Sequence, residues 1–227
     1  MNVIMKFGGT SVADAEAMTR VISIVRDHVQ RYPASRVPVV VVSAMSKVTD
    51  RLVETGRLAG ERQGTEAAQI LADLLARHLG VAESLVQGGA LETLKRDLTA
   101  DFEALSAQVQ QWAKDGDVSP AATDVILAAG ELASSRMVAA AFIQRGIAAA
   151  WVDARRVLVT DAEHTVAAPD TDATTTQARA LVASCTAKGE VPVLGGFIGA
   201  TAAGATTTLG RGGSDYSAAI FGACLDV

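Results

Sequence analysis

The chain has 227 residues, of which 49% are hydrophobic and only 4% aromatic. It can therefore bury a substantial core built mostly from aliphatic side chains, and it is not disordered as a whole. Its formal net charge of -5 argues against a protein that wraps nucleic acid or lies on an anionic membrane. Any affinity for phosphate must come from a local site.

Cysteine and histidine are scarce in this sequence. The two cysteines cannot form a disulfide framework or a tetrahedral metal site, and the three histidines lie far apart. The N-terminus lacks the apolar region of a signal peptide, and no stretch approaches the ~18 apolar residues of a membrane span. These features predict a cytoplasmic α/β domain without a metal site, a nucleic-acid surface or a membrane segment.

The first part of the chain is expected to form a strand, a glycine turn and a helix. Residues 3–7 are a short apolar run that ends in a glycine pair. Apolar residues within 18–29 recur three and four apart, which predicts a helix, and Ser11 with Asp14 would form a capping box at its start. Residues 37–43 are apolar on both faces, as in a parallel strand covered by helices on either side.

The middle of the chain has a helical pattern. Residues 65–114 predict two helices, and the longer one carries an apolar stripe from Leu91 to Trp112 with three- and four-residue spacing. Such a stripe is typical of a core or helix–helix contact. We therefore expect a helical hairpin inserted into an α/β scheme at about residues 60–116.

The second half returns to alternating helices and strands. Ser119 and Pro120 are typical of an N-cap and a first-turn proline, and the helix after them is interrupted at Gly130-Glu131 before it ends near Arg145. This alternation predicts an open, mainly parallel sheet. The remaining predicted elements are strands at 147–152 and 191–198, a helix at 175–188, a Gly/Thr-rich segment at 199–213 and a final helix at 214–225.

Three turns that follow apolar strands are the candidates for a binding site. They comprise residues 6–11, 43–49 and 209–215, and in an open parallel sheet such turns gather in one crevice. The glycine pairs at 8–9 and 212–213 each precede a helix, so their backbone N–H groups could bind an anion. Neither pair has the Walker A or GxGxxG spacing, so each alone is weak evidence.

Four charged residues accompany these turns. Lys6 ends its strand beside the first glycine pair and could hold phosphate oxygens as a point charge. Arg211 lies between glycines and could bind a carboxylate or phosphate with two N–H groups. Three of the four have an ordinary alternative: a solvated lysine for Lys6, helix capping for Asp215, and a surface position for Glu131.

The residues near these turns also bear on the class of reaction. They include no histidine, and the sequence contains no GxSxG motif, so acyl transfer through an activated nucleophile has no support. A kinase that acts on a carboxylate needs no general base, because its acceptor is already ionised at neutral pH. It needs cations and oriented donors around the transferred phosphoryl group, which these turns could supply.

Four segments together resemble the signature sequences of aspartate kinases. They are residues 6–12 (KFGGTSV), 41–50 (VVSAMSKVTD), 130–136 (GELASSR) and 206–216 (TTTLGRGGSDY), in the order of that family. The resemblance runs over the whole chain, and it implies the three-layer α/β/α amino acid kinase fold. It also implies transfer of the γ-phosphoryl group of ATP, with Mg²⁺ carried by the nucleotide, to the side-chain carboxylate of L-aspartate. The product would be 4-phospho-L-aspartate, on the route to lysine, threonine and methionine.

The same resemblance implies roles for individual residues. Lys6 would contact the transferred phosphoryl group, and Asp215 would fix Lys6 in place as an organising carboxylate. Arg211 would clamp a carboxylate of aspartate, Glu131 would pair with its ammonium, and Thr49 would hydrogen-bond it. The other implied contacts are backbone donors to the nucleotide at Gly8 and Gly9, and substrate contacts at Ser43, Gly212, Gly213 and Ser214.

The sequence also departs from the family pattern. Lys47 stands where a small residue is common, and residues 195–197 (GGF) replace a polar-Gly-Phe sequence. After the last helix, the family has a strand with a Thr-Asp pair and a downstream lysine that hold the adenine nucleotide, followed by regulatory ACT domains. We therefore expect residues 1–227 to be a catalytic domain that is incomplete at its C-terminal end, without ACT domains, from a protein that forms homo-oligomers when full length.

Two other functions are compatible with the sequence. One is a related kinase for glutamate, N-acetylglutamate or a nucleoside monophosphate, although Glu131 disfavours an N-acylated substrate that has no ammonium. The other is a non-catalytic binding or assembly subunit that keeps the fold without nucleotide affinity. An aspartate-dependent acyl phosphate would distinguish the aspartate kinase from both.

Overall fold

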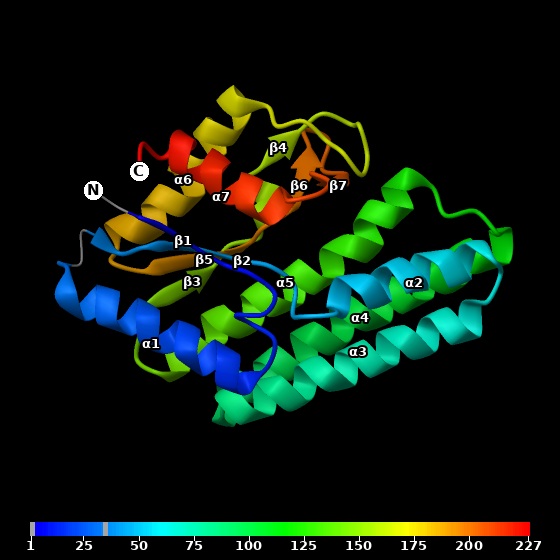
Figure 1. Cartoon of the computed structure of the whole chain (residues 1–227), viewed down its shortest axis with the longest axis horizontal. Coiled ribbons are helices and arrows are strands. Elements are labelled where there is room, and N and C mark those ends of the chain that lie inside the picture. Colours follow the sequence, from blue (N-terminus) through cyan, green and yellow to red (C-terminus); the bar gives the residue numbers. More distant parts are fainter. Residues whose placement is uncertain (1–2, 34–35) are drawn as a thin grey trace.

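A central parallel sheet organises the computed structural model, which describes residues 3–33 and 36–227. Its strand order is β1-β2-β5-β3, and all neighbouring strands are parallel. Helices cover both faces of this sheet (Figure 1), which confirms the predicted three-layer α/β/α arrangement. The strands are β1 (Ile4–Phe7), β2 (Val39–Val42), β3 (Ala149–Trp151) and β5 (Val191–Gly195).

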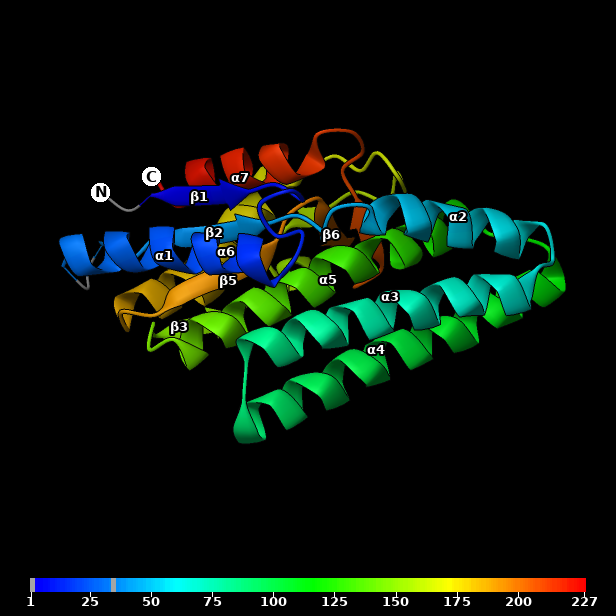
Figure 2. The ribbon, with the colours of Figure 1, turned by 60° about the horizontal axis from the view of Figure 1, so that its bottom comes forward.

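The four valines of β2 explain why both faces are covered. Val40 and Val42 are buried in the cluster that contains the apolar faces of α1 and α5, whereas Val39 and Val41 are buried in the cluster of α6 and α7. A strand with β-branched residues on both faces is stable only between two apolar layers. Figure 2 shows the layers nearly edge-on. The helices are α1 (Ala15–Arg31), α5 (Pro120–Gln144), α6 (Thr171–Ala187) and α7 (Gly213–Cys224).

The start of α1 differs from the predicted capping box. Asp14, not Ser11, is the N-cap, and its carboxylate accepts a hydrogen bond from the Ala17 amide at 2.8 Å. The Ser11 amide instead donates to the carbonyl of Gly8 at 2.8 Å and closes the glycine turn. Ser11 thus belongs to the turn, and the helix begins three residues later than the box predicts.

The predicted helical insertion is confirmed. Helix α2 (Val48–Gly60) is followed by α3 (Gly64–Leu85) and α4 (Gly88–Asp115), and α3 and α4 run side by side as a hairpin that packs on α2 and α5 (Figure 2). Five apolar side chains of the predicted stripe on α4 are buried, as expected for a helix–helix contact. They are Leu94, Leu98, Phe102, Leu105 and Val109.

Helix α5 runs through the centre of the molecule without the interruption predicted at Gly130. Ser119 caps it by accepting a hydrogen bond from the Ala122 amide at 3.1 Å. A Cβ atom on Gly130 would lie only 2.7 Å from the Cβ of Ala44, so this glycine permits a close helix approach instead of ending the helix. By length and hydropathy α5 could cross a membrane, contrary to expectation, but 72% of that stretch is buried inside the protein.

A second, smaller sheet was not predicted. Its order is β4-β6-β7, with β6 and β7 antiparallel. Its strands have only two to four residues, too few to show an alternation of apolar and polar residues, and β6 and β7 fall in or beside the Gly/Thr-rich segment. The strands are β4 (Val159–Thr160), β6 (Ile198–Thr201) and β7 (Thr206–Thr208), and β7 packs against α5.

Candidate functional site

A cavity of about 730 Å³ opens where β1, β2 and β5 end and where α2 and α7 begin. The three turns predicted to converge all contribute to it, although they are separated by as many as two hundred positions in sequence. Of the predicted site residues, Gly8 alone is not part of its lining. The predicted residues that line the cavity are Lys6, Gly9, Ser43, Thr49, Glu131, Arg211, Gly212, Gly213, Ser214 and Asp215.

An ion pair joins the first turn to the last. The Lys6 Nζ atom lies 2.8 Å from the Asp215 Oδ1 atom, with the lysine side chain 25% exposed and the aspartate 76% exposed. A Cβ atom on Gly8 would lie 3.6 Å from the same Nζ, so the ammonium lies directly against the glycine turn. The predicted pairing of Lys6 with Asp215 is thus present in the structure.

Close packing explains the glycines around the start of α7. A Cβ atom on Gly213 would lie 2.7 Å from the Phe197 ring, and one on Gly196 would lie 2.8 Å from the Cα of Ser214. Gly212, the N-cap, has a φ of 73°, in the left-handed region that favours glycine. The first amides of α7 therefore border the cavity at the positive end of the helix dipole.

The loop after β2 packs directly on the first glycine turn. The Ser46 amide donates to the carbonyl of Gly9 at 3.1 Å. A Cβ atom on Gly9 would lie 2.9 Å from the Ala44 carbonyl oxygen, so a side chain at this position would push the two loops apart. Lys47, which ends this loop, adopts a φ of 68° and leads into α2. Glycine at position 47 would adopt that left-handed conformation with less strain.

Glu131 is the buried acid of the cavity, with 3% of its surface exposed. Its Oε1 atom accepts a hydrogen bond from the Ala44 amide at 3.2 Å, whereas Oε2 has no hydrogen-bond partner among the described residues. Burial raises the pKa of Glu131 to about 8. An unpartnered carboxylate oxygen at the wall of a cavity is suited to receive a cationic group from a ligand.

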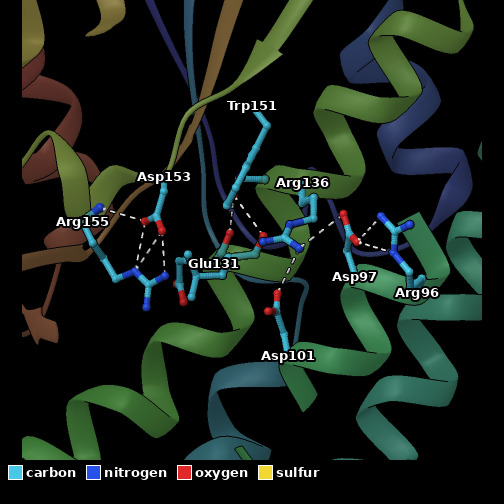
Figure 3. Close-up of polar contacts among 10 residues, drawn as sticks. Arg96, Asp97, Asp101, Glu131, Arg136, Trp151, Asp153 and Arg155 are labelled. Carbon is cyan, nitrogen blue, oxygen red and sulfur yellow. Dashed lines mark hydrogen bonds and ion pairs between the residues drawn. The ribbon is translucent and has the colours of Figure 1, made fainter. Parts of the chain in front are cut away.

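Helix α5 is fixed on its far side by a network of polar contacts (Figure 3). The Ser135 hydroxyl donates to the Glu131 carbonyl at 2.7 Å and accepts from the Trp151 indole at 3.0 Å. The Arg136 guanidinium lies 4.2 Å from the centre of the Trp151 ring and 3.2 Å from the Asp101 carboxylate. These contacts connect the turn of α5 that carries Glu131 to β3 and α4.

Sequence reasoning missed a buried acid behind the cavity wall. Asp124 accepts hydrogen bonds from the Thr208 hydroxyl at 2.5 Å and from the Thr165 amide at 3.0 Å, and it lies 2.7 Å from the His164 ring nitrogen. Both threonines line the cavity. The only sequence signal was an aspartate in the apolar first half of a helix, and its partners come from β7 and from the loop after β4, neither of which was predicted.

These features define a class of protein: an α/β domain with a cavity suited to a small molecule that carries both charges, next to a lysine and helix N-termini suited to phosphate. The comparison with known families agrees, because the profile described as "Amino acid kinase family" matches residues 1–227. The chain belongs to the amino acid kinase family.

Several known proteins are similar over nearly the whole chain. It is 34% identical over 226 residues to lysine-sensitive aspartokinase 3 of Escherichia coli, covering 98% of this chain and 46% of that protein. It is 33% identical over 220 residues to bifunctional aspartokinase/homoserine dehydrogenase 1 of Zea mays, covering 96% of this chain and 23% of that protein. This chain therefore spans less than half the length of either relative.

The fold matches solved structures equally well. A crystal structure of E. coli aspartokinase III in complex with lysine and aspartate superposes with a TM-score of 0.86 at 32% identity, covering 100% of this chain and 47% of that one. A second structure of that enzyme, in complex with aspartate and ADP, gives a TM-score of 0.85. These matches confirm the predicted amino acid kinase fold.

Proposed function

We propose that this domain binds L-aspartate and takes part in transferring the γ-phosphoryl group of ATP to its side-chain carboxylate. The observation that carries the proposal is the presence, in one cavity, of a buried acid with an unpartnered oxygen, an exposed guanidinium and the Lys6–Asp215 ion pair. The names of the relatives support it, as do the solved structures described as complexes with aspartate and with ADP.

In this proposal the substrate is held by its three charged groups. Glu131 receives the ammonium at its unpartnered Oε2 atom, and Arg211 receives a carboxylate. Thr49, Ser43 and Ser214 line the same cavity and supply hydroxyl groups. The reacting carboxylate then faces Lys6 without needing a base, because it is already ionised.

The phosphoryl group is held by fixed positive charge. Lys6, the amides of Gly8 and Gly9 and the N-terminus of α7 at Gly212 would contact its oxygens. MgATP, when bound, supplies the phosphoryl group. Asp215 has a positioning role: its 2.8 Å contact orients the Lys6 ammonium. These residues fit a phosphate, because the lysine is presented at a glycine turn and beside helix amides.

An assay for acyl phosphate tests the reaction. With ATP, Mg²⁺ and hydroxylamine, the full-length protein should form aspartyl hydroxamate only when L-aspartate is present, and Lys6→Ala should abolish it. Arg211→Ala should raise the aspartate requirement about tenfold or more, because a charge-assisted contact is lost. Equal hydroxamate from wild type and Lys6→Ala would refute the assigned phosphoryl contact.

The two alternative functions would give different results in this assay. Hydroxamate from N-acetylglutamate instead of aspartate would indicate the related kinase, and aspartate binding without any transfer would indicate a binding subunit. A cytoplasmic location, homo-oligomers, an incomplete C-terminal end and the lack of ACT domains stay predictions. The names of the plant relatives place those proteins in chloroplasts.

A further inference from the structure

Arg77, on helix α3 of the inserted hairpin, contacts two loops of the cavity at once. Its Nη1 atom donates to the carbonyl of Ser46 at 2.8 Å, and its Nη2 atom donates to the carbonyl of Ala13 at 3.0 Å. These acceptors are 31 and 64 residues away in sequence. The side chain is partly buried, and Arg77 is not among the residues that line the cavity.

The two loops are the ones expected to hold phosphate and substrate. Ala13 closes the segment that begins at the glycine turn, and Ser46 lies in the loop after β2. The same two loops also meet through the hydrogen bond from the Ser46 amide to the Gly9 carbonyl at 3.1 Å. Arg77 adds the second attachment, so that Ser46 is held through both its N–H and its C=O.

We propose that Arg77 is a positioning residue. It fixes the segment from the glycine turn to Ala13 relative to the loop after β2 that contains Ser46, and the inserted hairpin thereby supports the cavity. The expected effect of Arg77 on aspartate binding rests on the proposed function. The planar guanidinium is suited to the task, because two of its N–H groups can reach two carbonyls at fixed separation. A lysine ammonium is a single point charge, so a lysine at this position would hold the two loops together less firmly.

Amide hydrogen exchange on the whole chain tests the geometry without relying on catalysis. In Arg77→Met we expect about tenfold faster exchange at the Ser11 and Ser46 amides, a smaller effect in Arg77→Lys, and no change at the Phe197 amide on the opposite wall. Arg20→Met is the matched control, because Arg20 is exposed and pairs with Glu16 on its own helix. Unchanged exchange in both loops would overturn the proposal.

Two further measurements exclude a general structural effect. If exchange rises uniformly along the chain in step with a lower free energy of unfolding, Arg77 only stabilises the fold and the proposal is wrong. The affinity for L-aspartate should fall about tenfold in Arg77→Met and less in Arg77→Lys, and unchanged affinity despite mobile loops would also overturn it. If the wild-type chain binds no aspartate, the proposed function fails, while the exchange data still decide whether Arg77 holds the loops.

Discussion

At the scale of single residues, the cavity depends most on the protonation state of Glu131. Burial raises its pKa to about 8, so the empty cavity holds a neutral carboxylic acid at pH 7. A ligand ammonium beside the free Oε2 atom would favour the charged form and lower that pKa. Binding of an amino acid should therefore displace a proton from the protein.

This linkage gives a measurable prediction. At pH 7, binding of L-aspartate should release about 0.9 proton, because a group with a pKa near 8 is mostly protonated there. The apparent affinity should rise up to about tenfold between pH 6 and pH 7. Titration calorimetry in buffers of different ionisation enthalpy measures the released proton directly.

Glu131→Gln provides the control, because an amide of the same shape can still accept from the Ala44 amide. This variant should bind aspartate more weakly, without proton release and with little pH dependence. It should also remove the loss of stability that the wild type suffers as pH rises from 4.5 towards 8, because the Glu131 carboxyl ionises in the unfolded chain while burial keeps it neutral in the folded protein. An unchanged proton count in Glu131→Gln would mean that another group titrates.

The residues of the cavity were predictable in part. Lys6, Arg211 and Asp215 stand in turns whose position after parallel strands predicts a shared crevice, and the structure places them together. Asp124 and Arg77 were not predictable, because each lies within a helix and acts on segments distant in sequence. Their partners follow from tertiary packing, which no local pattern encodes.

At the scale of elements, the contact between α5 and α2 depends on Gly130. Glycine inside a helix normally costs about 1 kcal/mol relative to alanine, yet here a Cβ would lie 2.7 Å from Ala44 and 3.1 Å from Val48. Gly130→Ala should therefore destabilise the protein by about 1–3 kcal/mol in urea unfolding, because the neighbouring side chains must move.

Gly80 gives the matched comparison for this prediction. It lies within α3, and a Cβ there would meet nothing within 4 Å. Gly80→Ala should stabilise the protein by about 0.5–1 kcal/mol, since only helix propensity changes. If both substitutions had the same sign, the close helix approach at Gly130 would not explain the choice of glycine.

The hairpin contains a buried histidine that should make it sensitive to acid. His78 lies between α3 and α4 against Phe102, and burial lowers its pKa to about 4. In the folded protein the ring stays neutral, whereas in the unfolded chain it takes up a proton below the ordinary histidine pKa of about 6.5. The protein therefore loses stability as pH falls from 6.5 towards 4.

Replacing this histidine tests whether its titration lowers the free energy of unfolding in acid. In His78→Leu, the drop in free energy of unfolding between pH 7 and pH 5 should be about 2 kcal/mol smaller than in wild type. His28→Leu is the control, because His28 lies at the surface of α1. Equal drops in wild type and His78→Leu would show that His78 does not titrate on unfolding.

Helices and strands were predicted correctly where the local pattern of apolar residues is strong. The long helices α3 and α4 were predicted because apolar residues recur at helical spacing over many turns. The strand β2 was predicted because it is a run of four buried valines. The strands β4 and β7 were missed because two or three residues cannot show an alternation.

At the scale of the whole molecule, the parallel sheet brings segments that are distant in sequence together at one site. The strands β1, β2 and β5 end at the same edge, so the turns that follow them surround one cavity. The second sheet contributes Thr208 to the cavity wall, and the hairpin holds two of the surrounding loops through Arg77. This arrangement accounts for a site whose residues span nearly the full length of the chain.

An NMR titration of the chain with L-aspartate tests this convergence most directly. We predict that one equivalent of ligand shifts amide signals in all three segments together, residues 6–11, 43–49 and 211–215, whereas N-acetyl-L-aspartate, which lacks the ammonium that Glu131 would receive, leaves them unchanged. Shifts confined to one segment, or equal shifts with both ligands, would contradict the account.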